Sequence, residues 1–173
     1  LQSVHDASVL LLPSTRHGFI LAIMLFSIFF NLWLKQIKVK NMKGYVTGIE
    51  KETRKSTDFR RVLYTGKYSQ LVLMSLKAGE EIGMETHKTV DQFFRFEQGE
   101  GNVIIDGVEH RVKDGDAVIV PAGAKHNVVN TSKKAELKLY TIYSPPEHQD
   151  KVVRHTKAEA IASPEEFDGR TTE

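Results

Sequence analysis

Short apolar runs with the two-residue period of β-strands are the dominant pattern from residue 70 to residue 144. The run QLVLMSL at residues 70–76 is typical of a largely buried strand, and QFFRFE at residues 92–97 predicts a second strand that is rich in aromatic side chains. Asp106-Gly107 lies between β-forming residues and is a strong signal for a two-residue hairpin. Because such runs recur roughly every 8–12 residues with turn signals between them, we expect an all-β sandwich or barrel.

The sequence after Pro145-Pro146 loses this period. Residues 156–162, TKAEAIA, are good helix formers. Ser163 followed by Pro164 is typical of the start of a further helical turn, through SPEEF. We therefore expect a short C-terminal helical tail on the surface of the domain.

The first 41 residues differ from the rest in composition. Residues 18–34 form the most apolar run of the chain, and 17 residues is the lower limit for a membrane-spanning helix. Three lysines between residues 35 and 40 would keep the following domain in the cytoplasm. The alternative is that residues 1–41 are a mis-assigned start and that Met42 is the natural one. In both cases we expect a separate domain at residues 42–173. This domain would be cytoplasmic, or, if residues 18–34 are an anchor, attached to the membrane and facing the cytoplasm.

The charge balance argues against a nucleic-acid partner. The formal net charge is +2, but residues 1–41 contain four basic residues and one acidic residue, so the remainder has a slight acidic excess. A domain without a basic excess or a basic stripe gives no support to nucleic-acid binding. The chain has no cysteine, which excludes disulfides and thiolate metal sites.

Two sets of residues with fixed spacing are the candidates for a functional site. The first set is Gly79, Glu85, His87, Gln92 and Gly99, and the second set is Gly115, Pro121, Gly123, His126 and Asn130. Side chains two apart on a strand point to the same face, so Glu85 and His87 are expected to lie together. Gln92 opens the next strand, and His126 begins another after a Pro-x-Gly turn. Four donors that point inward from neighbouring strands could bind a metal ion inside a small barrel.

These spacings resemble the two signature motifs of the cupin superfamily. The second motif matches at every signature position, whereas the first has Glu85, His87 and Gln92 where the family usually has His, His and Glu. From Met42 onward the chain is similar to the small single-domain bacterial cupins of type 2, which are often called mannose-6-phosphate isomerase-like. That label follows fold similarity and does not establish a reaction.

The resemblance implies a particular fold and assembly. The fold would be a double-stranded β-helix, the RmlC-like jelly-roll barrel, with its core at about residues 70–144. A homodimer is also implied, and Gly44–Tyr64 and Glu136–Tyr143 are candidates for strands that cross or pair between subunits.

The predicted metal ligands are Glu85, His87, Gln92 and His126. Two imidazoles, one carboxylate and one amide oxygen suit a divalent ion such as iron, manganese, zinc or nickel. The alternative is a polar pocket that has lost its metal, in which Glu85 and Gln92 form hydrogen bonds. Asp91 competes with Gln92 for the fourth position, but counting back from Gly99 favours Gln92, and alternation then points Asp91 outward.

The same alternation predicts the surroundings of the site. If Gln92 and His126 point inward, so do Phe94 and Val128, which we expect as pocket walls, with Phe96 deeper in the core. His110 is expected to be exposed between charged neighbours. The SPPEH segment at residues 144–148 could fold over the barrel mouth, but a solvated loop is favoured.

Two functions fit this site. The first is a metal-dependent enzyme that acts on a small organic molecule as an oxygenase, isomerase or lyase. The second is a cupin module that binds or senses a small ligand without chemistry. No residue of the sequence selects the reaction, the substrate or the metal.

Overall fold

The computed structural model describes residues 42–173. The apolar run at residues 18–34 and the question of an anchor or a start at Met42 therefore concern residues outside the described part. Within residues 42–173, no helix has the length and apolar character needed to cross a membrane. Residues 43–173 fold as one unit.

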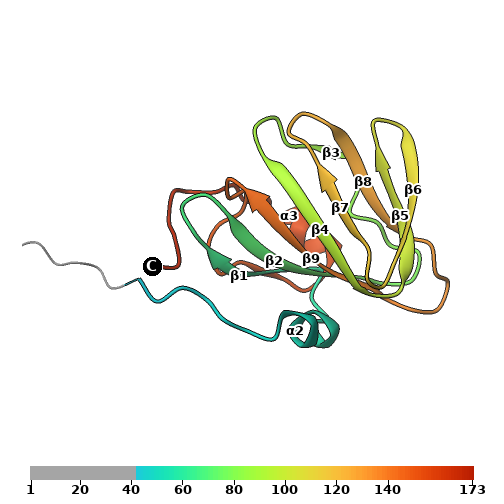
Figure 1. Ribbon diagram of the computed structural model, residues 1–173, viewed down its shortest axis with the longest axis horizontal. Coiled ribbons are helices and arrows are strands. Elements are labelled where there is room, and N and C mark those ends of the chain that lie inside the picture. Colours follow the sequence, from blue (N-terminus) through green and yellow to red (C-terminus); the bar gives the residue numbers. More distant parts are fainter. Residues whose placement is uncertain (1–41) are drawn as a thin grey trace, which may run out of the picture. The chain divides into compact units, whose positions relative to one another are not determined.

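Ten strands in the described residues form two antiparallel sheets (Figure 1). In order, the larger sheet contains β10 (Val153–Arg154), β1 (Arg60–Thr65), β2 (Gln70–Leu76), β9 (Leu137–Ser144), β4 (Asp91–Gln98) and β7 (Ala117–Val120). The smaller sheet contains β3 (Glu85–Thr86), β8 (Lys125–Asn130), β5 (Glu100–Ile105) and β6 (Val108–Lys113). Two short helices complete the part of the chain that the structure describes, α2 (Ile49–Lys55) and α3 (Lys157–Ala162).

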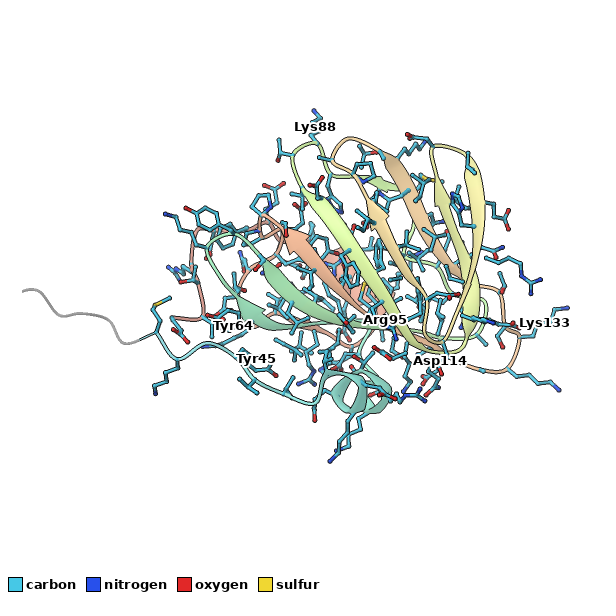
Figure 2. All side chains as sticks on the ribbon, viewed as in Figure 1. Tyr45, Tyr64, Lys88, Arg95, Asp114 and Lys133 are labelled. Atoms are coloured by element: carbon cyan, nitrogen blue, oxygen red, sulfur yellow. The ribbon has the colours of Figure 1, made fainter. Side chains whose placement is uncertain are left out.

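The space between the two sheets is filled by apolar side chains (Figure 2). Strand β4 illustrates how the alternation works, because Gln92, Phe94 and Phe96 are all buried on one face of it. The rings of Phe94 and Phe96 stack with centroids 6.5 Å apart. The double-stranded β-helix that the sequence predicts is thereby confirmed, with the core between the sheets.

The hairpin at Asp106-Gly107 is confirmed as well. Ile105 and Val108 are paired, and the two residues between them have φ angles of 47° and 84°. Positive φ at both central positions is what a type I′ turn requires, and this turn matches the twist of the flanking strands.

The segments expected to cross or pair between subunits have contacts within the chain. Residues 49–55 within Gly44–Tyr64 form α2 instead of a strand, and this helix packs against β9, β4 and β2. Strand β9, which covers most of Glu136–Tyr143, lies between β2 and β4, so both of its edges are paired. Crossing or pairing of these two segments between subunits stays a prediction, as does the homodimer itself.

The helical tail is confirmed, but it ends earlier than the sequence predicts. The hydroxyl of Thr156 caps α3 by accepting a hydrogen bond from the Glu159 amide at 3.2 Å. Ser163 ends this helix instead of starting a new one, and SPEEF is not helical. Thr156 and Ser163 both stand three residues before a glutamate, but only at Thr156 do the capping hydrogen bonds form, with Glu159 also accepting from the His155 amide at 2.7 Å.

Candidate metal centre

Two strands of the smaller sheet bring the first two donors together. Glu85 on β3 is paired directly with His126 on β8, so their side chains start from adjacent positions on the same face. His87 follows β3 in a loop whose position is fixed by the Gly123 amide, which donates to the His87 carbonyl at 2.8 Å. Gln92 comes from β4 of the larger sheet, so the donors span both layers of the fold.

The donor atoms of these residues converge. Glu85 Oε1 lies 3.3 Å from His126 Nε2 and 3.4 Å from His87 Nε2. The ligand atoms of these three residues all lie within 4.8 Å of one another. Gln92 Oε1 lies 2.9 Å from His126 Nε2. The four residues expected as ligands therefore lie in one cluster.

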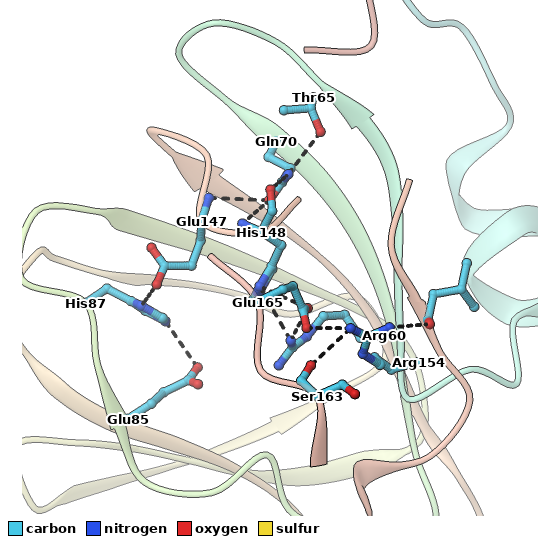
Figure 3. Close-up of polar contacts among 11 residues, drawn as sticks. Arg60, Thr65, Gln70, Glu85, His87, Glu147, His148, Arg154, Ser163 and Glu165 are labelled. Carbon is cyan, nitrogen blue, oxygen red and sulfur yellow. Dashed lines mark hydrogen bonds and ion pairs between the residues drawn. The ribbon is translucent and has the colours of Figure 1, made fainter. Parts of the chain in front are cut away.

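Hydrogen bonds on the outer side of each ring orient the two imidazoles. His126 Nδ1 donates to the Ala124 carbonyl at 3.1 Å, and His87 Nδ1 donates to Glu147 Oε1 at 3.0 Å (Figure 3). A ring that carries its proton on Nδ1 presents an unprotonated Nε2, which is the atom that binds a metal. Both Nε2 atoms point towards Glu85.

Two of the inward atoms have no hydrogen-bond partner among the described residues. These are Glu85 Oε1 and His87 Nε2, and both are buried. Buried polar atoms without partners are costly, and each such case needs a physical reason. A bound cation supplies that reason, because it would contact both atoms at once.

The distances between the donors also fit a single ion. Ligands about 2.0–2.2 Å from one metal ion lie roughly 3.0–3.5 Å from their neighbours on that ion. The distances of 2.9, 3.3 and 3.4 Å in this cluster are close to that range.

A hydrogen bond orients the side-chain amide of Gln92. Its Nε2 donates to Thr141 Oγ1 at 3.1 Å, which leaves Oε1 facing His126 Nε2. With Nδ1 of His126 protonated, this pair consists of two acceptors, and a cation would be attracted to both.

The electrostatics of the cluster favour positive charge. Burial would raise the pKa of Glu85, but ion-pair contacts of its Oε1 with His126 and His87, at 3.3 and 3.4 Å, outweigh burial and lower the pKa to about 2. Burial would lower the pKa of His87, but the hydrogen bond with Glu147 and the ion-pair contact with Glu85 raise the pKa to about 9. In the metal-free protein the cluster thus carries a proton on His87, and metal binding would displace it.

Other predicted residues lie around the cluster. Asp91 is exposed and accepts a hydrogen bond from the Ala122 amide at 2.8 Å, pointing away from the donors as alternation predicts. Phe94 and Val128 have no exposed surface and belong to the hydrophobic core, so they pack below the donors and do not form an open pocket wall. His110 is exposed, as expected.

The prediction of a solvated SPPEH loop is wrong. Only 6% of His148 is exposed, and its ring packs edge-on against Tyr143 with centroids 5.0 Å apart. Glu147 from the same segment reaches His87. Sequence reasoning missed Glu147 because it lies 60 residues from His87 and outside both spaced motifs. The only signal was a carboxylate and a histidine that follow a pair of prolines at the end of a strand.

Tyr143 is a further residue that the sequence did not single out. Its ring is buried and meets the His87 ring edge-on, with centroids 5.6 Å apart. Burial raises the pKa of the Tyr143 phenol, and the charge on Glu85 raises it further. The hydroxyl therefore keeps its proton beside the donor cluster.

Comparisons with known proteins agree with this architecture. A family model described as "Cupin domain" matches residues 72–143, which include all four candidate ligands. The uncharacterised protein YrkC of Bacillus subtilis is 46% identical over 127 residues, covering 70% of this chain and 68% of that protein. The uncharacterised protein L612 of Acanthamoeba polyphaga mimivirus is 42% identical over 108 residues, covering 60% of this chain and 67% of that protein. The crystal structure of BH2720 from Bacillus halodurans has a TM-score of 0.68 and 42% identity, covering 72% of this chain and 98% of that chain.

Proposed function

The chain belongs to the cupin domain family. We propose that it binds a metal ion and acts as a metal-dependent enzyme on a small organic molecule. The observation that carries the proposal is the convergence of buried donor atoms without partners among the described residues, Glu85 Oε1 and His87 Nε2, beside His126 Nε2.

The donor set indicates which ions suit the site. Two imidazoles and one carboxylate form the ligand type that binds iron with open coordination positions, and the same donors accept manganese, zinc or nickel. Gln92 would add a neutral amide oxygen, so the ligand set keeps one negative charge. A bound divalent ion would supply Lewis-acid chemistry to a substrate oxygen.

The residues around the donors have separate tasks in this proposal. Glu85 and Glu147 are the most exposed members, with side-chain exposures of 26% and 30%, so a substrate would approach from their side. The Tyr143 phenol, which stays protonated, supplies a hydrogen-bond donor next to the site. Phe94 and Val128 keep the floor of the site apolar and dry.

The direct test is metal analysis of purified and reloaded protein. We expect about one divalent ion per chain in the wild type and a strong loss in His126→Ala, because an imidazole ligand is removed. His110→Ala is the matched control, since it removes an exposed histidine outside the cluster and should leave the metal content unchanged. If the wild type and His126→Ala bind equally little metal after reloading, the metal-dependent function is wrong.

A second variant addresses the role of the amide. Gln92→Leu should weaken metal binding less than His126→Ala, because a neutral amide oxygen is a weaker ligand than an imidazole. Turnover of a panel of small organic acids, sugars and aromatics by metal-loaded protein then separates an enzyme from a cupin that binds a ligand without chemistry. Binding of a panel member without turnover would favour the non-catalytic alternative.

A further inference from the structure

Glu147 contacts the candidate metal centre from outside both spaced motifs. It follows β9 and lies beyond the residues of the family match, which ends at residue 143. Its Oε1 lies 3.0 Å from His87 Nδ1, at the edge of the ring that points away from the donor cluster (Figure 3). The His87 ring is therefore held between two carboxylates, Glu85 on the Nε2 side and Glu147 on the Nδ1 side.

The main chain around Glu147 is fixed independently of its side chain. The fully buried Gln70 accepts from the His148 amide at 3.0 Å and donates to the His148 carbonyl at 2.7 Å. Gln70 also donates to Thr65 Oγ1 at 2.9 Å, which fixes the orientation of its amide. On the other side, the Phe167 amide donates to the Glu147 carbonyl at 2.8 Å.

A partly buried ion cluster connects the same segment to the larger sheet and to the C-terminal tail. Glu165 has a side chain that is only 3% exposed, and it pairs with Arg60 and Arg154, each at 3.0 Å. Arg60 also lies 3.4 Å from His148 Nδ1. The segment that carries Glu147 is thus held at several points, and a carboxylate held in this way loses little entropy when it binds the His87 ring.

We propose that Glu147 is a positioning residue of the metal centre, which holds His87 with its proton on Nδ1 and its Nε2 directed to the metal. The proposal rests on the proposed function, because it assumes that the cluster binds a metal ion. A carboxylate on the outer nitrogen also makes the imidazole a stronger ligand. His126 has a backbone carbonyl in the corresponding place, so only His87 is oriented by a side chain that substitution can remove.

Four proteins test this role, with Co²⁺ as the probe ion. They are the wild type, Glu147→Ala, Glu147→Gln and Glu166→Gln. Competition with a chelator should show that Glu147→Ala weakens Co²⁺ binding by about 10–100-fold. Glu147→Gln should lose less, because its amide oxygen still accepts the Nδ1 proton. Glu166→Gln removes the same charge from an exposed position in the C-terminal tail, and this variant should bind Co²⁺ as the wild type does.

A spectroscopic readout separates positioning from a general effect on folding. In the Co²⁺-loaded wild type, proton NMR should show two shifted exchangeable signals, from the Nδ1 protons of His87 and His126. Glu147→Ala should lose the His87 signal by fast exchange with water and keep the His126 signal. Glu147→Gln should keep both.

Each outcome decides between the two proposals. If the wild type binds Co²⁺ but Glu147→Ala binds within about two-fold of it and shows both signals, the positioning role is wrong and the metal function stands. If the wild type binds no Co²⁺, both proposals are wrong. Thermal unfolding of the metal-free proteins checks the fold. Should Glu147→Ala not fold, Glu147→Gln must still show a measurable loss of affinity, and wild-type affinity in that variant would overturn the positioning role.

Discussion

His148 is a buried histidine whose ring lies next to a cation. Burial and, to a smaller extent, the charge on Arg60 lower the pKa of His148 to about 3. Glu165 Oε1 lies 3.6 Å from His148 Nδ1, but the charge of Glu165 is already shared between Arg60 and Arg154. His148 is therefore neutral in the folded protein at pH values at which the unfolded chain protonates it.

This difference predicts a pH dependence of stability. Between the unfolded pKa of 6.5 and the folded pKa of about 3, the unfolded state binds more protons at His148, so stability falls as the pH is lowered through this window. The loss from pH 6.5 to about pH 5 should reach about 2 kcal/mol. Urea unfolding of metal-free wild type and His148→Gln at both pH values checks this, because the variant lacks the titrating ring. Equal losses in the two proteins would contradict the neutral state of His148.

Among the secondary-structure elements, α2 is the one whose end depends most clearly on a distant residue. Lys138 on β9 is buried, and its Nζ donates to the Arg54 carbonyl at 3.0 Å and the Ser56 carbonyl at 2.9 Å. These carbonyls lie at the C-terminal end of α2, where a cation also interacts favourably with the helix dipole. The lysine thus fastens the helix to the larger sheet.

Lys138→Met should lower the free energy of unfolding by about 1–3 kcal/mol, because two partly buried carbonyls lose their charged partner while the side-chain volume is nearly kept. Lys133→Met is the control, since Lys133 is exposed and projects away from the sheets in Figure 2. Urea unfolding of both variants measures the difference. A Lys138→Met protein as stable as Lys133→Met would show that the helix end does not need this cap.

The elements also show how far the sequence alone could lead. Period-two patterns and fixed turn residues predict the strands and place Glu85 and His87 on one face, because both depend on local geometry. The convergence with His126 is a long-range contact, which the resemblance to the cupin motifs implies. Helix α2 was missed although Glu50 and Arg54 are spaced for an i,i+4 pair, which the structure shows at 3.0 Å. Glu147 could not be placed, because its contact with His87 depends on the path of the chain after β9, which Gln70 and Phe167 determine through long-range hydrogen bonds.

At the scale of the whole molecule, the donor cluster joins the two sheets. Glu85 and His126 belong to the smaller sheet, whereas Gln92 lies on β4 of the larger sheet. Without a cation, the inward face of this junction holds Glu85 Oε1 without a hydrogen-bond partner in the described part of the chain. A metal ion at this point would bind only the folded chain, because these residues converge only when both sheets are formed.

Metal binding should therefore stabilise the whole domain by mass action. At a free Zn²⁺ concentration about 100-fold above the dissociation constant, the free energy of unfolding should rise by about 2.7 kcal/mol. For a domain of this size, the midpoint of thermal unfolding should rise by roughly 10 °C relative to protein treated with a chelator.

Two variants show whether this increase depends on the donor cluster. His126→Ala should lose the increase, because it lacks one imidazole of the cluster. Asp91→Asn should keep it, since Asp91 bonds to the Ala122 amide outside the cluster, even if the substitution lowers the midpoint of the metal-free protein. If the wild type unfolds at the same temperature with and without Zn²⁺, the donors do not hold this ion in the folded state, and the contact between Gln92 and His126 joins the two sheets at this point without a metal.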